Sequence, residues 1–216
     1  MITIILADDH TVVRDGLRFL LEAQPDLTVI GDAANGREAV RQVAQHCPDI
    51  AILDIAMPEL NGIEAMGQIH ELCPDTQVII LSMYATTEHI FRALQAGARG
   101  YLLKESAGAE VVEAVRAVNI GRRHLSQKIS DKVVNGFVGQ DEAKRDQAPL
   151  ARLSPREREI LQLVVEGKSS AEIGHTLALS PKTVETYRSR LMKKLGLSNL
   201  PDLVKFAVRH GLTPLE

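Results

Sequence analysis

The sequence has no long apolar run and few cysteines, and each shortage excludes a class of protein. None of its apolar stretches approaches the roughly 20 residues needed to span a membrane. Asp8 and Asp9 interrupt the N-terminal apolar stretch too early for a signal peptide. Two cysteines, Cys47 and Cys73, are too few for a disulfide framework in 216 residues. We therefore expect a protein of the reducing cytoplasm without a membrane span.

Charge is distributed unevenly along a chain of ordinary globular composition. Residues 1–122 carry nine Lys/Arg and seventeen Asp/Glu, a net charge of −8, whereas residues 151–216 carry eleven and seven, a net charge of +4. The segment between them carries +1, and the whole chain −3. An acidic first half and a basic last third indicate different partners, with a polyanion the candidate for the basic part.

The first 122 residues alternate between apolar strand patterns and helical patterns. Five such strand–helix units with short connections predict an α/β fold, a five-stranded parallel doubly wound sheet with helices on both faces. The expected strands are residues 2–7, 27–31, 50–54, 77–82 and 100–103, and the expected helices are residues 12–23, 36–46, 62–72, 87–96 and 109–120.

One carboxylate, Asp54, ends the apolar stretch IAILD that lies between Pro48 and Pro58. Such a run is typical of a strand buried on both faces. Asp54 would then lie at the carboxyl end of a central strand, where open α/β sheets place their chemistry. Because burying an unpaired charge is costly, Asp54 needs partners from elsewhere in the chain.

Polar residues at the ends of neighbouring strands are the candidate partners. Asp8 and Asp9 follow the first strand, Ser82 ends the fourth and Lys104 follows the fifth. In a flavodoxin-like strand order, strands one, three and four are neighbours, so three carboxylates would converge. Carboxylates so close raise one another's pKa unless a positive charge intervenes. Mg²⁺ prefers such oxygen ligands and would also neutralise a phosphoryl group arriving at Asp54.

The rest of the chain has helical patterns only. Residues 127–137 have modest helical periodicity, and residues 139–150 (GQDEAKRDQAPL) have the composition of a linker. Four helices are then expected, each with a Ser or Asn at its start that can cap the first turn. We expect a first domain at residues 1–122, a helix and linker at 123–150, and an all-α four-helix domain at 151–216 with helices 154–166, 169–177, 180–195 and 199–209.

The helix expected at residues 180–195 has an apolar face and an opposite face that is polar and basic. The preceding helix and a short Ala-Leu-Ser turn complete a helix-turn-helix unit. The polar face suits a DNA major groove, where short polar side chains reach base edges and long basic ones reach phosphates. The candidates are Glu185, Thr186 and Ser189 for base edges and Lys182, Arg188, Arg190 and Lys193 for phosphates.

Motifs in both halves resemble one protein family. LADDH (6–10), LDIAMPELNG (53–62), IILS (79–82) and GARGYLLK (97–104) resemble the receiver domain of two-component response regulators. LSPREREILQLVVEG (153–167), SSAEIGHTLALSPKTVETY (169–187) and LMKKLGL (191–197) resemble the LuxR-type helix-turn-helix domain of NarL/FixJ response regulators.

The resemblance implies that Asp54 accepts a phosphoryl group from a sensor histidine kinase. Glu105 follows Lys104 where many receivers have proline, and Ser82 stands where threonine is frequent. The implied Mg²⁺ ligands are Asp8, Asp9, Asp54 and the backbone carbonyl of Ala56, and the implied switch and phosphoryl-contact residues are Ser82, Tyr101 and Lys104.

For the basic domain, the resemblance implies that residues 180–195 form the recognition helix and that residues 199–209 support a homodimer on activation. Phosphorylation would control dimerisation and sequence-specific binding to double-stranded DNA, and RNA polymerase is a further candidate partner. Gly174 stands where the family often has alanine. A glycine inside a helix costs up to about 1 kcal/mol of stability.

Three other interpretations remain open. A regulator that binds DNA without phosphorylation is the most serious, and the activity of an Asp54→Asn variant would decide it. A phosphatase with an aspartyl nucleophile would need an acid/base partner that no second motif supplies. We therefore expect self-catalysed phosphoryl transfer to Asp54 and slow hydrolysis, without a metabolic substrate. A ligand-sensing LuxR regulator would need a different pattern in the N-terminal half.

Overall fold

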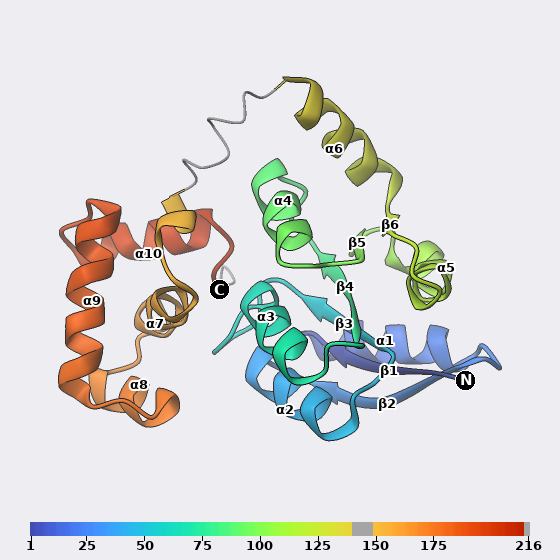
Figure 1. Cartoon of the computed structure of the whole chain (residues 1–216), viewed down its shortest axis with the longest axis horizontal. Helices are drawn as coiled ribbons and strands as arrows, with labels where there is room; N and C mark the ends of the chain where they lie inside the picture. Colours follow the sequence, from blue (N-terminus) through green and yellow to red (C-terminus); the bar gives the residue numbers. More distant parts are fainter. Residues whose placement is uncertain (140–148, 214–216) are drawn as a thin grey trace. The chain divides into compact units, whose positions relative to one another are not determined.

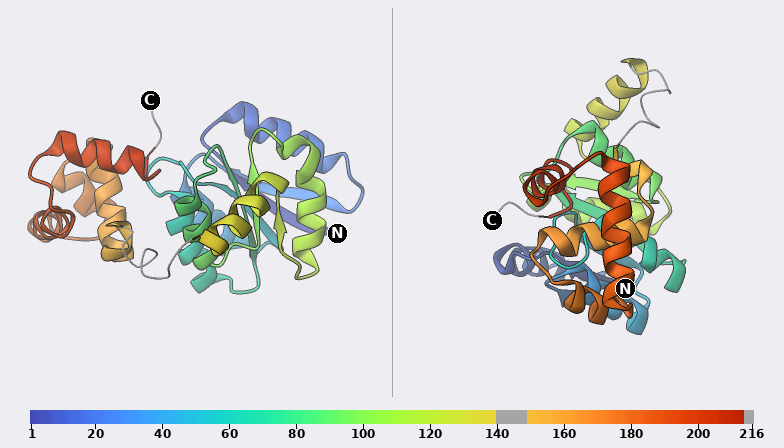
Figure 2. Two further views of the ribbon diagram at one scale, coloured as in Figure 1. Left: turned by 90° about the horizontal axis from the view of Figure 1, so that it is seen from above. Right: turned by 90° about the vertical axis from the view of Figure 1, so that its left-hand side faces the viewer.

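The chain divides into two compact units, Met1–Gly139 and Gln140–Glu216. Figure 1 and Figure 2 trace both from blue to red in a computed structural model, which describes residues 1–139 and 149–213. Most of the linker expected at residues 139–150 lies outside the described residues. The domain boundaries inferred from the sequence stay predictions, although the first helix of the expected connecting segment belongs to the first unit. None of the helices in the described residues is long and apolar enough to cross a bilayer.

Within residues 1–139, parallel strands form one sheet in the order β2-β1-β3-β4-β5-β6. The parallel α/β fold is confirmed, and β3 lies between β1 and β4 as the flavodoxin-like order requires. We expected five strands and the sheet has six. The strand that was missed, β6, has two residues, which is too short to produce an apolar pattern. The strands are β1 (Ile2–Ala7), β2 (Leu27–Ala33), β3 (Ile50–Asp54), β4 (Gln77–Ser82), β5 (Gly100–Leu103) and β6 (His124–Leu125).

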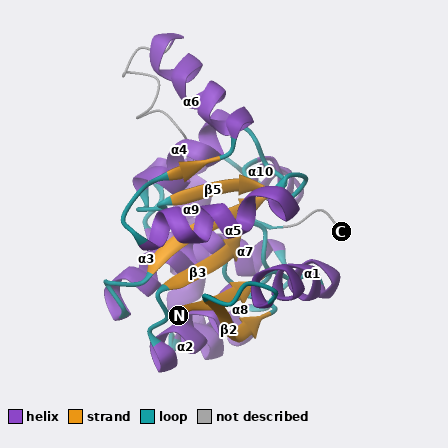
Figure 3. Ribbon diagram, turned by 90° about the vertical axis from the view of Figure 1, so that its right-hand side faces the viewer, coloured by secondary structure: helices purple, strands orange, loops and turns teal. Residues whose placement is uncertain are grey.

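Helices cover both faces of this sheet, which is drawn in orange in Figure 3. Apolar residues of α1 and α5 pack with one face, and those of α2, α3 and α4 pack with the other. Each face therefore has its own buried core. The helices are α1 (Thr11–Glu22), α2 (Gly36–His46), α3 (Gly62–Leu72), α4 (Thr87–Gln95) and α5 (Ala107–Asn119).

Strand β3 is buried on both faces, as its unbroken apolar sequence predicts. Ile50 and Ile52 pack in the core with α1 and α5, whereas Ala51 and Leu53 pack in the core with α2, α3 and α4. Asp54 ends the strand and is 3% exposed. The fold thus places one carboxylate at the carboxyl edge of the central strand.

A further helix, α6 (Gln127–Gly139), follows β6 and contacts α4. Ile129 is fully buried in the same core as α2, α3 and α4, and Val133 packs against that core. Lys132 Nζ donates a hydrogen bond of 2.6 Å to the carbonyl oxygen of Ala85. The helix is therefore an integral part of the first unit.

The second unit is helical, as expected. Its elements are a 3₁₀ turn η2 (Pro149–Arg152) and the helices α7 (Pro155–Val165), α8 (Ser170–Leu177), α9 (Pro181–Leu195) and α10 (Leu200–Arg209). All four predicted capping residues are confirmed, since the side chain of each accepts a hydrogen bond from a first-turn backbone N–H. These residues are Ser154, Ser169, Ser180 and Asn199.

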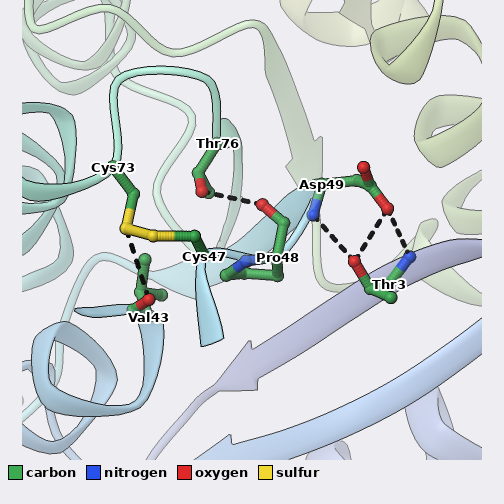
Figure 4. The surroundings of a disulfide bond; sticks show 7 residues. All are labelled: Thr3, Val43, Cys47, Pro48, Asp49, Cys73 and Thr76. Carbon is green, nitrogen blue, oxygen red and sulfur yellow. Dashed lines mark hydrogen bonds between the residues drawn. A yellow bond between two sulfur atoms is a disulfide. The ribbon is translucent and has the colours of Figure 1, made fainter. Parts of the chain in front are cut away.

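One expectation about the cysteines is wrong. We expected a reducing environment and no disulfide framework, but Cys47 and Cys73 are bonded, with their Cα atoms 5.6 Å apart (Figure 4). The physical reason is the topology. Helices α2 and α3 contact each other on one face of the sheet and both run back toward its opposite edge, so their C-terminal residues meet although 26 positions separate them.

Candidate functional sites

The end of β3 is held tightly against the start of α3. Gly62 donates its backbone N–H to the carbonyl oxygen of Ile55 over 2.9 Å. A Cβ atom on Gly62 would lie 2.0 Å from the carbonyl oxygen of Asp54, so no larger residue fits this turn without moving the backbone. Asn61 caps α3 by accepting hydrogen bonds from the N–H groups of Ile63 and Glu64. The sequence LNG therefore fixes the backbone beside Asp54.

Lys104 joins two of the predicted site carboxylates. Its Nζ donates a hydrogen bond of 2.7 Å to Asp54 Oδ2. It also lies 2.7 Å from Asp8 Oδ2 and forms an ion pair with that carboxylate. The Lys104 backbone N–H donates to the carbonyl oxygen of Ser82 over 3.0 Å. The structure thus brings together residues at the carboxyl ends of β1, β3, β4 and β5, as the sequence predicted.

Burial changes the acidity of these groups. Desolvation raises the pKa of Asp54 from 3.8 to about 6, against the opposing effect of Lys104, and the negative charges of Asp8 and Asp9 raise it further. Burial alone would lower the pKa of Lys104, but the charge of Asp54 and the hydrogen bond to it raise that pKa above 10.5. At neutral pH the site therefore holds an ionised carboxylate beside an ammonium group.

The carboxylates form a cluster that could hold a cation. One ligand atom from each of Asp8, Asp9, His10 and Asp54 lies within 4.8 Å of the others. The sequence did not identify His10 as part of this cluster, although it is the last residue of the LADDH motif. Its Nδ1 lies 2.7 Å from Asp9 Oδ1 and 3.0 Å from Asp8 Oδ1. Ala56, whose carbonyl was expected as a ligand, lies in the buried turn after β3.

Ser82 and Tyr101, two of the predicted switch and phosphoryl-contact residues, both form a hydrogen bond with Tyr84, which the sequence did not single out. The hydroxyl oxygen of Ser82 accepts a hydrogen bond of 3.0 Å from the backbone N–H of Tyr84. The hydroxyl of Tyr101, which is fully buried, donates a hydrogen bond of 2.7 Å to the carbonyl oxygen of Tyr84. Burial, aided by the charge of Asp54, raises the pKa of Tyr84 above 10.0. The β4–α4 loop therefore connects Ser82 to Tyr101.

Glu105, which stands where many receivers have proline, has an ordinary peptide bond and a partner. No peptide bond in the described residues is cis. The Glu105 carboxylate lies 2.6 Å from Lys128 Nζ at the start of α6. The departure from the family pattern thus adds an ion pair between the β5–α5 loop and α6.

Helix α9 presents the polar face that the sequence predicted. Val184 and Leu191 are fully buried on its opposite face. Arg188 is half-buried, in agreement with its position near the buried flank. Lys194 differs from its neighbour Lys193, because its Nζ lies 2.7 Å from the buried carboxylate of Glu157 on α7. The exposed predicted DNA-contact residues are Lys182, Glu185, Thr186, Ser189, Arg190 and Lys193.

The turn between α8 and α9 requires a glycine. The backbone N–H of Leu179 donates to the carbonyl oxygen of Gly174 over 2.8 Å. A Cβ atom on Gly174 would lie 2.6 Å from the carbonyl oxygen of Leu179. The departure from alanine, which the sequence alone presented as a cost in stability, allows this close approach of α8 to the turn.

Comparisons with known proteins agree with both parts of this structure. Residues 4–116 match the response regulator receiver domain, and residues 151–207 match the luxR family of bacterial regulatory proteins. The chain is 40% identical over 213 residues to the oxygen regulatory protein NreC of Staphylococcus epidermidis, with 97% of this chain and 98% of that protein covered. NreC of Staphylococcus carnosus is 41% identical over 213 residues, again with 97% of this chain and 98% of that protein covered.

A solved structure of the response regulator RcsB in complex with DNA is also similar. It is 25% identical with a TM-score of 0.58, and the match covers 95% of this chain and 96% of that one. Together with the buried Asp54–Lys104 pair and the basic face of α9, these matches fix the family. The chain belongs to the two-component response regulators that join a receiver domain to a LuxR-type DNA-binding domain, and it is a transcription regulator.

Proposed function

We propose that Asp54 is the phosphoacceptor of this regulator and that a sensor histidine kinase is the donor. The observation that carries the proposal is the buried Asp54 carboxylate with a pKa of about 6, hydrogen-bonded to Lys104. At neutral pH this carboxylate is ionised and more basic than an ordinary aspartate, which favours attack on phosphorus. The new O–P bond replaces the N–P bond of the kinase phosphohistidine, and the imidazole leaves with a proton.

Mg²⁺ fits the acidic cluster. Asp8 Oδ2 and Asp9 Oδ1 are buried carboxylate oxygens, each with one side-chain nitrogen at 2.7 Å, Lys104 Nζ and His10 Nδ1 respectively. Hard divalent cations prefer carboxylate oxygens of this kind, and the residues that would hold the ion are Asp8, Asp9, Asp54 and the Ala56 carbonyl. When bound, Mg²⁺ would supply positive charge that offsets the charge of the phosphoryl oxygens.

Lys104 and Ser82 would then respond to the phosphoryl group. An aspartyl phosphate adds roughly −1.5 to −2 charge to the site, and Lys104 Nζ already lies 2.7 Å from the reacting carboxylate. Its ammonium would pair with a phosphoryl oxygen. The hydroxyl of Ser82 would donate to another, which changes its contact with the backbone of Tyr84 and, through it, with Tyr101.

Helix α6 is placed to carry this change out of the site. Lys132 bonds the carbonyl of Ala85 in the β4–α4 loop, and Lys128 pairs with Glu105 in the β5–α5 loop. The backbone N–H of Ser126 donates to the carbonyl oxygen of Tyr101 over 3.1 Å. Both loops beside the phosphoacceptor therefore attach to the segment that leads toward the DNA-binding domain, so a shift in either loop would bias α6.

The proposed output is sequence-specific binding of α9 in a DNA major groove. Its exposed face carries short polar side chains for base edges and basic side chains for phosphates. We propose Glu185, Thr186 and Ser189 for the first role and Lys182, Arg188, Arg190 and Lys193 for the second. Phosphorylation would shift a pre-existing equilibrium toward a homodimer that binds paired half-sites.

The remaining parts of the proposal follow from this role. Transcriptional control would take place in the cytoplasm, with RNA polymerase as a further partner. The aspartyl phosphate would hydrolyse slowly at the site that formed it, which resets the regulator without any metabolic substrate.

The test compares Asp54→Asn with the wild type and with Asp75→Asn, which removes an exposed carboxylate at the opposite edge of the sheet. Each protein is incubated with acetyl phosphate and Mg²⁺, and incorporated phosphate, oligomeric state and DNA affinity are measured. We expect Asp54→Asn to lose phosphorylation entirely and to stay at the unphosphorylated wild-type DNA affinity, and Asp75→Asn to behave as the wild type. Phosphate incorporation into Asp54→Asn would refute the assignment. Equal DNA affinity of phosphorylated and unphosphorylated wild type would favour a phosphorylation-independent regulator.

A further inference from the structure

The Cys47–Cys73 disulfide joins two helices at the sheet edge opposite the phosphoacceptor. Cys47 is the residue that ends α2, and Cys73 ends α3. Each is followed by a proline and then by the strand that leads back across the sheet, β3 or β4. The bond thus closes one end of the α2–α3 layer. Figure 4 shows the disulfide and its immediate neighbours.

The two cysteine residues differ in exposure. Cys47 is exposed, whereas Cys73 is 3% exposed and belongs to the buried core of this face. An external thiol can therefore reach Cys47 much more easily than Cys73. In thiol–disulfide exchange the attacked sulfur acquires the new partner and the other sulfur leaves as a thiolate. Attack at Cys47, the exposed residue of the pair, would therefore release Cys73 as the leaving thiolate.

The buried sulfur is accommodated in the reduced state as well. Cys73 Sγ lies 3.4 Å from the carbonyl oxygen of Val43. A disulfide sulfur carries no proton, so this contact becomes an S–H···O hydrogen bond only when Cys73 is a thiol. A reduced Cys73 would thus have a hydrogen-bond acceptor in place without rearrangement of α2.

The surrounding edge does not depend on the disulfide. Thr76 Oγ1 donates to the carbonyl oxygen of Pro48 over 2.7 Å, directly beside the bond (Figure 4). Asp49 Oδ2 accepts from the backbone N–H and the hydroxyl of Thr3 at 2.8 and 2.7 Å. These hydrogen bonds tie β1, β3 and the α3–β4 connection together, so opening the disulfide would leave the sheet edge closed.

We propose that Cys47–Cys73 is a redox-active thiol–disulfide exchange site whose reaction partner is a low-molecular-weight thiol of the glutathione class. A thiolate attacks Cys47 Sγ, a mixed disulfide forms there, and the Cys73 thiolate leaves and takes up a proton. A second thiolate attacks the sulfur of the bound small thiol and releases Cys47. The net reaction converts one protein disulfide and two thiols into two cysteine thiols and one small disulfide, a transfer of two electrons. Oxidised small thiol drives the reverse reaction.

The consequence is control of how firmly α2 and α3 are held. At their other ends, Gly36 of α2 is packed so closely that a Cβ would lie 2.0 Å from the carbonyl oxygen of Leu60, in the loop that follows Asp54. The layer is thus fastened by backbone contact near Asp54 and by a covalent bond at the opposite edge. Reduction removes the second fastening and allows the C-terminal turns of α2 and α3 to open locally.

The first experiment measures the exchange reaction on the full-length protein. The protein is equilibrated in buffers with different ratios of reduced to oxidised glutathione, quenched with acid and alkylated, and the added mass is recorded. We expect both thiols to appear together in a reversible transition, with unchanged circular dichroism. A disulfide that survives in every buffer in which the protein stays folded would overturn the proposal, as would two thiols that never close in oxidised glutathione.

Single variants test the direction of attack. In Cys73→Ser the remaining Cys47 should form a glutathione mixed disulfide, and in Cys47→Ser the buried Cys73 should do so at least about 10-fold more slowly. Equal rates would refute the assigned order. Intact mass gives both rates, and circular dichroism verifies that each variant is folded.

Amide hydrogen exchange tests the effect on the layer. Reduction should accelerate exchange in α2 and α3 and lower the melting temperature of the first unit by about 5–10 °C, because the closed loop is lost from the unfolded chain. The Cys47→Ser/Cys73→Ser double variant should match the reduced protein and no longer respond to glutathione. Identical exchange in oxidised and reduced protein would contradict this part. None of these measurements involves phosphoryl transfer, so their failure would leave the proposed function intact.

Discussion

The two units of this regulator place their functional charges in opposite environments. In the first unit, Asp8 and Asp54 are 2% and 3% exposed, and the pKa of Asp54 is raised to about 6. In the second unit, the proposed DNA contacts are exposed side chains on one face of α9, apart from the half-buried Arg188. Burial of the carboxylates in the first unit costs electrostatic free energy. The charged side chains of α9 in the second unit stay hydrated until DNA binds.

This difference follows from what each unit has to do. A carboxylate that forms a bond to phosphorus benefits from a dry site, where nearby charges act strongly and its basicity is raised. A surface that binds DNA gains affinity by releasing the counterions of phosphates, and it does not need to be buried beforehand. The first unit therefore carries the free-energy cost of burying charge. Its stability should change more than that of the second unit when a functional charge is removed.

The largest expected effect is a gain in stability when Asp54 becomes Asn. Because the pKa of Asp54 is raised from 3.8 to about 6, the favourable contribution of its protonated form is complete below pH 3.8 and is lost as pH rises through about 6. At pH 7.5 without Mg²⁺, Asp54→Asn should stabilise the first unit by about 1–3 kcal/mol. Hydrogen exchange of β1 and β3 peptides at increasing urea concentrations measures this gain.

The pH dependence provides the control for this prediction. Well below pH 3.8 the wild-type carboxyl is protonated in both the folded and the unfolded state, so the advantage of Asp54→Asn should vanish. Asp75→Asn, at an exposed position, should change stability little at either pH. If Asp54→Asn were destabilising at pH 7.5, the ion pair with Lys104 would outweigh desolvation, and the contrast between the two units would fail.

Features that repeat along the chain could be predicted from the sequence. The apolar run of β3 fixed its burial on both faces, and the parallel order followed from successive strand–helix units. Ser154 and Ser169 lie directly before helical patterns and have Glu three residues later, which is the spacing of the capping boxes that the structure contains. At each of these positions, the residues nearby in the sequence are sufficient to predict the local structure.

Features that depend on distant contacts were missed. Tyr84 connects Ser82 and Tyr101 through its backbone N–H and carbonyl, groups that every residue type possesses. The disulfide depends on two helix ends meeting in space, and two isolated cysteines carry no signal of this. For the same reason, Gly174 was expected only to lower stability. Only the folded turn shows that a Cβ atom at this position would meet a backbone oxygen.

Two glycines sharpen the comparison between the units. Both lie inside helices, but a Cβ on Gly67 in α3 would meet nothing within 4 Å, whereas one on Gly174 in α8 would meet a backbone oxygen at 2.6 Å. Gly67→Ala should therefore stabilise the first unit by about 0.5–1 kcal/mol. Gly174→Ala should destabilise the second unit by about 1–3 kcal/mol, because the backbone has to move. Hydrogen exchange of peptides from α3 and α8 compares them, and a gain from Gly174→Ala would show that the turn relaxes easily.

The adjacent lysines of α9 offer the smallest but most specific test. Lys193 is exposed, and we expect Lys193→Ala to leave stability unchanged, to weaken binding to all DNA sequences alike and to reduce the salt slope by about one unit. Lys194 pairs with Glu157, whose side chain is 5% exposed. Lys194→Ala should therefore cost the second unit about 1 kcal/mol of stability at pH 7. Binding titrations at several salt concentrations and urea unfolding separate the two effects, and a changed sequence preference in Lys193→Ala would refute its phosphate role.

Acid then distinguishes the Lys194–Glu157 pair from an ordinary surface contact. Burial raises the pKa of Glu157, but hydrogen bonds from Lys194 and from the Ser154 backbone outweigh it, so that pKa lies below 4.5. The stability from this carboxylate is present above pH 4.5 and is lost as pH falls through the lowered pKa. Without Lys194, burial of Glu157 is opposed less, so the acid-induced loss should begin at a higher pH in Lys194→Ala than in Lys193→Ala. Coincident acid-unfolding curves for the two variants would mean that Glu157 is held by its cap alone.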